Sequence, residues 1–368
     1  MGGGALSAVE LDGATEAAGT ARRTAVAGLV AFLVIAVAGI SWAKWDPYFH
    51  KAFVVAATHR LGVSILSGAR PAPPEPSLGA AVGYALTYFQ AIWTALVAGL
   101  LVAAAAEALL PRRWLLRVMS GRGRLGAVAG GLLALPCMMC TCCSAPAAVS
   151  LRRAGVPVGP ALAWWVGNPA INPAVILFAA FVLPWPWVVL RLAAGLVLVF
   201  VVVALVARLA PSARAGAVEA GEGADDPGPR GWGDAAVRYL RSLGRLSLTL
   251  LPEYLVIVLL LGAFRGWLFP VAHGLGAWGP LAVVLFAVAG TLFVIPTAGE
   301  IPIVQGMLGA GLGVAAPAAL LITLPAVSLP SLAMVWRSFP PRVSIALAGS
   351  VALLGVLTAL AASLLLRT

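Results

Sequence analysis

Nine long apolar runs dominate this chain and leave few folds open to it. Each run is at least about 20 residues long, the length that an α-helix needs to cross the hydrocarbon core of a bilayer. In lipid the backbone polar groups must be paired within the segment, so runs of this length predict helices. The sequence therefore predicts an all-α integral membrane protein. The runs cover residues 24–43, 80–109, 125–151, 157–183, 186–208, 246–269, 280–311, 314–337 and 342–366.

Composition excludes several other classes of protein. Of the 368 residues, 61% are hydrophobic and 10% are charged, with a formal net charge of +11. The basic residues stand mostly in short connections between the runs, which is typical of membrane proteins, whereas a nucleic-acid-binding protein gathers them on one soluble face. The chain also lacks a G-x-x-x-x-G-K-[ST] loop. We therefore expect no nucleic-acid partner and no nucleotide-driven motor within the chain.

The chain divides into two membrane halves. Residues 210–245 are rich in Gly, Pro and Ala and carry both acids and arginines, a composition that predicts a cytoplasmic linker. Residues 1–23 lack the pattern of a secretory signal and predict a disordered cytoplasmic tail. We expect an extra transmembrane helix and an external connection over 24–79, a first repeat over 80–209 and a second repeat over 246–368.

The two halves align at an offset of 156 residues, mainly through Pro and Gly. The connection after 80–109 is rich in arginine, whereas its counterpart around 266–280 has no Lys or Arg. The positive-inside rule places the two connections on opposite sides of the membrane, which predicts inverted repeats. Such repeats need an odd number of crossings each, so we expect seven full spans plus re-entrant hairpins at 125–151 and 280–311, with nine full spans as the alternative. The aligned pairs are Thr141 with Thr297, Pro146 with Pro302, Gly155 with Gly311, Val158 with Val314, Pro169 with Pro325, and Ala170 with Ala326.

All the cysteines of the chain lie within seven residues of the first predicted hairpin. They are Cys137, Cys140, Cys142 and Cys143. Breaks near Pro136 and Pro146 would place these thiols at the hairpin tip, near the bilayer midplane. A role as small buried hydrophobes does not explain such clustering. We predict a binding site for a thiophilic solute.

The ligand set within this motif has alternatives. Cys140 with Cys142, or Cys140 with Cys143, could chelate trivalent arsenic or Cu(I), which both favour low-coordinate thiolate ligation. A disulfide between Cys137 and Cys140 would instead support redox chemistry. Structural zinc is disfavoured, because it requires two separated ligand pairs.

A second motif, Asn168-Pro169-Ala-Ile-Asn172-Pro173, interrupts the run at 157–183. Each proline removes a backbone donor, so we expect two breaks in this helix. Non-helical backbone at membrane depth is tolerated where it is buried in protein or lines a polar cavity. The two asparagine amides therefore either stabilise a kink or contact a passing solute.

Three acids lie in or beside apolar runs, and such carboxylates are candidates for ion coupling. Glu107 precedes Arg112 and Arg113 and is predicted to be their interfacial partner. Glu253 is either a coupling group or a partner of Arg245. Glu300 aligns with the residue that follows the cysteine run, which makes it the strongest candidate for a proton site.

Together these motifs resemble the bacterial predicted-permease family that includes the organoarsenical (methylarsenite) efflux permease. The resemblance rests on Cys140-Thr-Cys142-Cys143-Ser-Ala-Pro146, on Leu151-Arg-Arg-Ala-Gly155-Val-Pro157 and on the Asn-Pro motif. It implies an inner-membrane permease, and for the arsenical branch it implies export of trivalent organoarsenicals through cysteine contacts, driven by the proton gradient. The family's C-x-C falls on Cys140 and Cys142, and its Asn-containing break on Asn168 and Asn172. Cys143 departs from the family pattern, which has Gly there.

The sequence thus predicts a multi-pass permease of the bacterial inner membrane rather than an enzyme. The substrate site consists of the four cysteines with Asn168 and Asn172, a soft metal would bind Cys140, Cys142 and Cys143, and Glu300 and Glu253 are the proton-coupling candidates. We expect no cofactor. The partners are a thiophilic metalloid or soft metal ion and the lipid bilayer, and a homodimer is left open. A membrane thiol-disulfide oxidoreductase and a Cu(I) transporter are the alternatives.

Overall fold

The computed structural model describes residues 26–62, 64–66, 74–119, 124–210, 231–268 and 279–366, and within these ranges all regular structure is helical. Seven helical segments are long and apolar enough to cross a membrane, as the sequence predicted. The predicted tail at 1–23 and most of the predicted linker lie outside the described residues. The spans are Val26–Thr58, Leu78–Leu109 (α3), Val158–Val182 (α7 and α8), Trp185–Ala207 (α9 and α10), Trp232–Leu268 (α11), Ala315–Val335 (α14 and α15) and Pro341–Leu365 (α16).

The first helix is longer than the sequence predicted. It runs from Val26 to Thr58 and contains a π-helical turn, Ser41–Trp45, before α2, Asp46–Thr58. We expected its end at residue 43, where charged residues interrupt the apolar run. The helix continues because the protein buries the charged Lys44, which is only 6% exposed. Pro47 does not end it either, since it lies in the first turn of α2, where its missing N–H is tolerated. The connection that follows is correspondingly shorter than 44–79.

Two pairs of short helices form the predicted hairpins. In the first, α5 (Arg124–Ala134) leads to α6 (Thr141–Arg153), and in the second, α12 (Gly279–Leu292) leads to α13 (Glu300–Gly309). Helices of this length measure about 15–21 Å, well short of the hydrocarbon thickness of about 30 Å. The connections, 135–140 and 293–299, are largely non-helical. Neither pair could span the membrane as two full crossings.

Two of the predicted proline breaks are wrong. Helix α6 continues through Pro146, so the first hairpin breaks only around Pro136. Helix α7 (Val158–Ala170) continues through Pro169, and a single break separates it from α8 (Pro173–Val182). A proline inside a helix removes one backbone hydrogen bond, a loss that buried surroundings can accommodate without ending the helix.

Positions 156 residues apart have the same local structure in the two halves. Two glycines that end helices have positive φ, two prolines stand one residue before a helix end, and two polar residues are N-caps. A shared offset at three unrelated features supports the predicted duplication. The matched residues are Gly155 and Gly311 (φ 88° and 75°), Pro169 and Pro325 in α7 and α14 (Ala315–Ala326), and Asn172 and Ser328 before α8 and α15 (Leu329–Val335).

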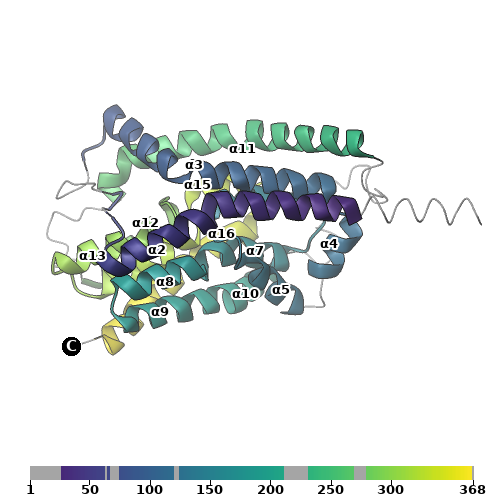
Figure 1. Cartoon of the computed structure of the whole chain (residues 1–368). Helices are drawn as coiled ribbons and strands as arrows, with labels where there is room; N and C mark the ends of the chain where they lie inside the picture. Colours follow the sequence, from purple (N-terminus) through teal and green to yellow (C-terminus); the bar gives the residue numbers. More distant parts are fainter. Residues whose placement is uncertain are drawn as a thin grey trace, which may run out of the picture.

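The two hairpins enter the molecule from opposite ends. Helices α4 (Arg112–Met119) and α5 lie at one end of the bundle, and α12 and α13 lie at the other (Figure 1). The first end carries Arg112, Arg152 and Arg153, so the positive-inside rule makes it cytoplasmic. The second hairpin therefore enters from the external side, as inverted repeats require.

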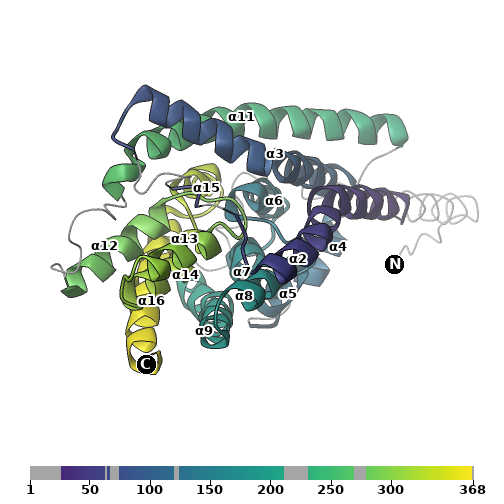
Figure 2. The same ribbon diagram turned by 60° about the vertical axis from the view of Figure 1, so that its left-hand side comes forward.

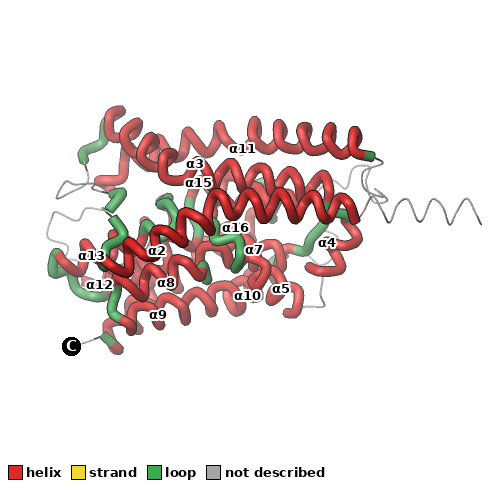
Figure 3. The backbone as a smooth tube through the Cα atoms, in the orientation of Figure 1, coloured by secondary structure: helices red, strands yellow, loops and turns green. Residues whose placement is uncertain are grey.

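The two broken helices, α7 with α8 and α14 with α15, lie at the centre of the bundle. In the most apolar stretch of α14 and α15, 89% of the residues are buried, compared with 17% in the first helix. Helices α3 and α11 lie side by side along one edge in Figure 2, and loop segments run inside the bundle as well as at its ends in Figure 3. Within the two hairpin connections, residues 139–140 and 293–295 are buried. The span Trp185–Ala207 consists of α9 (Trp185–Leu196), a π-helical turn (Val197–Val202) and α10 (Val203–Ala207).

Helices α3 and α6 cross closely at Gly99, where an added Cβ would collide with the carbonyl oxygen of Cys143. We expect Gly99→Ala to lower the free energy of unfolding by about 1–3 kcal/mol, because overpacking forces the backbones apart. Unfolding of the purified protein in detergent measures this. Gly83→Ala on the same helix is the matched control, since no atom lies within 4 Å of the added Cβ. Equal losses for the two variants would contradict a close crossing.

Candidate functional site

The cysteines occupy the tip of the first hairpin. Cys137 lies in the turn after α5, is partly exposed, and donates from its thiol to the Leu133 carbonyl oxygen at 3.7 Å. Cys140, Cys142 and Cys143 are buried at the start of α6. All four are free thiols in this structure, so the alternative disulfide between Cys137 and Cys140 is not formed here.

Cys140 and Cys143 form the close pair of the motif. Their sulfur atoms lie 3.0 Å apart. Cys140 is the N-cap residue of α6 and Cys143 is in its first turn, so a C-x-x-C spacing opens the helix. The partial positive charge of a helix start lies beside such thiols. Two thiols this close together can bind one soft centre jointly.

Cys142 faces a different set of partners. Its sulfur lies 3.3 Å from the Ser328 hydroxyl, and it also interacts with the hydroxyls of Tyr88 and Tyr254. The two tyrosines are buried and hydrogen-bonded to each other at 2.9 Å. In the described part of the chain, no group of three His, Cys, Asp or Glu side chains comes together as a metal site. The three-cysteine ligand set is thus not assembled in this structure.

The sequence reasoning missed these three partners of Cys142. One of them had a detectable signal, because Ser328 aligns with Asn172 at the offset of 156. The tyrosines belong to α3 and α11, and no sequence motif marks either of them.

Both asparagines bind backbone at the break beside the thiols. Asn168 donates to the Trp164 carbonyl oxygen at 2.9 Å and accepts from the Met139 N–H at 3.4 Å, so it holds the peptide that precedes Cys140. Asn172 caps α8 through its side-chain oxygen. Its amide nitrogen is buried and has no hydrogen-bond partner in the described part of the chain. The kink-stabilising role is therefore present for both residues.

Glu300 lies in a fully buried ion pair that the sequence did not predict. Its Oε1 lies 3.0 Å from Nη2 of Arg191, and both side chains have 0% exposure. Arg191 also donates to the carbonyl oxygens of Pro169 and Ala170, at 3.0 and 3.4 Å. The pair thus joins the second hairpin to the broken helix of the first repeat. Among the residues that the structure describes, Glu300 Oε2 and Arg191 Nε have no hydrogen-bond partner.

The predicted partners of the other two acids are wrong. Glu253 pairs with Arg337 at 3.1 Å on an exposed surface, and Arg245 pairs with Glu107. Eight residues of helix separate Arg245 from Glu253 by about 12 Å along the axis, which is too far for contact. Glu107 also accepts from Ser150 and Ser242 and lies on the cytoplasmic side. Glu253 is therefore a surface ion-pair residue in this structure.

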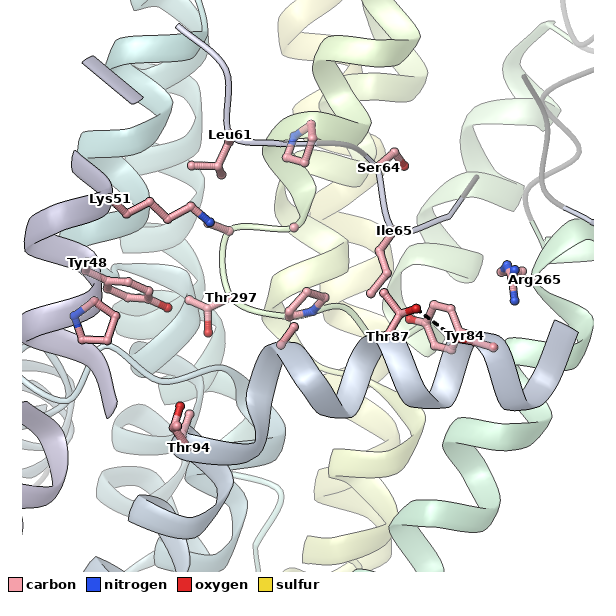
Figure 4. Close-up of a pocket in the computed structure, with 18 of the residues that line it drawn as sticks. Tyr48, Lys51, Leu61, Ser64, Ile65, Tyr84, Thr87, Thr94, Arg265 and Thr297 are labelled. Carbon is pink, nitrogen blue, oxygen red and sulfur yellow. Dashed lines mark hydrogen bonds between the residues drawn. The ribbon is translucent and has the colours of Figure 1, made fainter. Parts of the chain in front are cut away.

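A large cavity lies on the external side of the thiols. It has a volume of about 890 Å³ and is lined by the first helix, α3, Arg265 and residues 296–299 (Figure 4). A second space of about 10 Å³, enough for roughly one water molecule, is lined by Cys140, Glu300 and Ser328. The segment Pro296–Ala298 lines both spaces and separates them.

Lys44 binds the segment 296–298 that separates the two spaces. Its ammonium donates to the Thr297 hydroxyl at 3.0 Å and to the Tyr48 hydroxyl at 2.9 Å. It also interacts electrostatically with Cys140 and Cys143. The first helix thus supplies a charged group between the outer cavity and the thiols. Sequence reasoning assigned that charge to the external connection and missed this contact.

Comparison with known proteins identifies the family. The family model ArsP_1, described as a predicted permease, matches residues 78–364. The chain belongs to this predicted permease family. It is 45% identical over 329 residues to the UPF0718 protein YraQ of Escherichia coli (strain K12), an alignment that covers 89% of this chain and 92% of that protein. No solved structure matches the chain.

Membership of the permease family agrees with the predicted class of function. The protein is a multi-pass membrane permease of the bacterial inner membrane. The matched region contains both repeats and both hairpins, but it begins at residue 78, after the helix that carries Lys44. The contact between Lys44 and Thr297 therefore joins the family's core to an element outside the matched region.

Proposed function

We propose that this permease is a secondary transporter of a thiophilic solute, with trivalent organoarsenicals as the first candidate substrates. The observation that carries the proposal is the pair of free thiols, Cys140 and Cys143, 3.0 Å apart at the tip of a membrane hairpin. Trivalent arsenic favours low-coordinate thiolate ligation, and reversible binding by two sulfurs suits transport. The large cavity on one side of the pair supports a route to the thiols.

Inverted hairpins provide the means of alternating access. In the present conformation the large cavity lies on the external side, and the thiols are separated from it by the segment held by Lys44. A solute that binds one arrangement of the hairpins better than the other shifts the equilibrium between inward-open and outward-open states. Release then follows on the far side of the membrane.

Proton coupling through Glu300 is part of the proposal. Protonation of its carboxylate would remove the charge that holds Arg191, and Arg191 connects to the break between α7 and α8. The titration of one group would thereby alter the contact between the two repeats. Buried acids in membrane proteins commonly serve such coupling.

One observation favours a second candidate, a membrane thiol-disulfide oxidoreductase. The C-x-x-C spacing of Cys140 and Cys143 at a helix start is the arrangement that exchanging thiols use. The sequence suggested Cys137 with Cys140 as the exchanging pair. The structure brings a different pair together.

Transport in everted inner-membrane vesicles tests the proposal. Vesicles that contain the protein are expected to accumulate methylarsenite more than vesicles without it, and collapse of the pH gradient with a protonophore is expected to remove the difference. Arsenite, Cu(I) and Hg(II) complete the solute panel. Accumulation of none of the four would overturn the proposal. Reduction of an added disulfide, with Cys140 and Cys143 oxidised to a disulfide in return and no solute accumulated, would favour the oxidoreductase.

Glu300→Gln in the same assay isolates the coupling step. The variant is expected to lose most of the dependence on the pH gradient, because the glutamine amide does not titrate. Glu253→Gln is the matched control, since this acid lies in an exposed pair. An unchanged response to the gradient in Glu300→Gln would exclude Glu300 as the proton site.

A further inference from the structure

The outer cavity is the large cavity on the external side of the thiols, and the charged residues described in its wall are all positive. The charged side chains that line it are Lys44, Lys51 and Arg265, and no Asp or Glu is among the described residues of its wall. Lys44 and Lys51 are also the only lysines in the chain. In Figure 4 Lys51 extends from the first helix toward the segment that carries Thr297.

Nearby acids do not offset this charge within the cavity. Asp46 lies on the same helix but is paired with His50 at 3.5 Å, with both side chains more than 70% exposed. Glu75 is exposed, and neither acid lines the cavity. The remaining polar groups of the wall are hydroxyls that can donate hydrogen bonds. They belong to Tyr48, Ser64, Ser77, Tyr84, Thr87, Thr94 and Thr297.

The cationic groups are held at the wall by the fold. Arg265 donates to the carbonyl oxygens of Leu66 and Ala80, at 3.0 and 2.8 Å. Lys44 is held by Tyr48 and Thr297, as described above. Charges fixed in a concave site with low-dielectric walls focus the field and raise the local concentration of ions of opposite sign.

We propose that this cavity is an anion-binding vestibule, so that a solute passing between the thiols and the external side carries negative charge. The inference rests on the proposed transport function and narrows its substrate class to anionic thiol adducts of a metalloid. A volume of about 890 Å³ is in the range of pockets for drug-sized ligands and far exceeds the needs of a bare ion. A free Cu(I) cation would be repelled by the same wall.

Charge-selective thiol labelling tests the vestibule without relying on transport. Thr87 lines the cavity and is exposed, so Thr87→Cys provides a reporter thiol. Spheroplasts are treated from outside with an anionic sulfonatoethyl or a cationic trimethylammonioethyl methanethiosulfonate. Each rate is divided by the rate of that reagent with free 2-mercaptoethanol, and labelling of the parent protein is subtracted.

The normalised rate is expected to be higher for the anionic reagent. Lys51→Gln is expected to lower the ratio of anionic to cationic rates about fivefold, because the loss of one charge acts in opposite directions on the two reagents. High salt is expected to reduce the ratio as well. Arg60→Gln is the matched control, since it removes one positive charge on the same side from a residue that does not line the cavity.

Three results would overturn the vestibule. They are equal normalised rates for the two reagents, a preference for the cationic reagent, and a Thr87→Cys thiol that neither reagent reaches from outside. Failure of the transport proposal is recognised separately, because it shows as absent solute accumulation in vesicles. The labelling ratio stays measurable in that case.

Discussion

Replacement of Cys140 with serine is expected to reduce transport of a thiophilic solute by more than about tenfold. Even partners outside the first ligand shell of a metal typically cost 10–100-fold when mutated, and Cys140 would be a direct ligand. Serine offers a hard oxygen in place of a soft sulfur and leaves Cys143 as a single thiol. Initial rates of methylarsenite uptake into everted vesicles measure the effect.

The substitution is also expected to preserve the fold. Cys140 is the N-cap of α6, a position that serine favours, so the helix start is retained. Cys137→Ser is the matched control, because its sulfur lies in the turn after α5 and contacts only the Leu133 carbonyl among its described hydrogen bonds. We expect wild-type transport from that variant. Full activity of Cys140→Ser and of Cys143→Ser would refute binding by the thiol pair.

Replacement of Arg191 with methionine is expected to lower the free energy of unfolding by about 3–5 kcal/mol, because it leaves the buried Glu300 carboxylate without its partner. Arg191 and Glu300 both have 0% exposure, so bulk solvent does not reach the carboxylate that loses its partner. The variant also loses the bonds from Arg191 to the carbonyl oxygens at the break after α7. Unfolding of the purified protein in detergent measures the loss.

Two further variants separate the charge effect from the loss of packing. Arg337→Ala breaks the exposed pair with Glu253 and is expected to cost about 0–1 kcal/mol. The double variant Arg191→Met with Glu300→Gln removes both charges and is expected to recover part of the stability. A double variant less stable than Arg191→Met alone would show that the buried pair is not the source of the loss.

Much of the architecture could be predicted because the bilayer acts as a uniform solvent. Apolar length indicated nine runs, the placement of arginines reduced these to seven spans and two hairpins, and the offset of 156 residues indicated the repeats. The break of the first hairpin near Pro136 follows from local backbone chemistry. The same is true of the helix end at Gly155. The predicted breaks at Pro146 and Pro169 are wrong, because the backbone partners lost at a proline depend on surroundings that the sequence does not display.

The candidate site was predictable only in part. The cysteines were visible as a cluster, but the choice of Cys143 rather than Cys142 as the close partner of Cys140 depends on the helix start at residue 141. Glu300 was visible as a rare acid in an apolar run. Its partner Arg191 is 109 residues away, and no local pattern relates the two.

The sequence by itself determined the class of protein and the position of the thiols along the chain, since these follow from hydropathy and residue type, and it left seven or nine spans open. Only the tertiary structure decided which groups meet. Lys44 with Thr297 and Cys142 with Ser328 join residues 253 and 186 positions apart. Such contacts arise from the packing of one repeat and the first helix against the other repeat, which is a property of the folded chain as a whole.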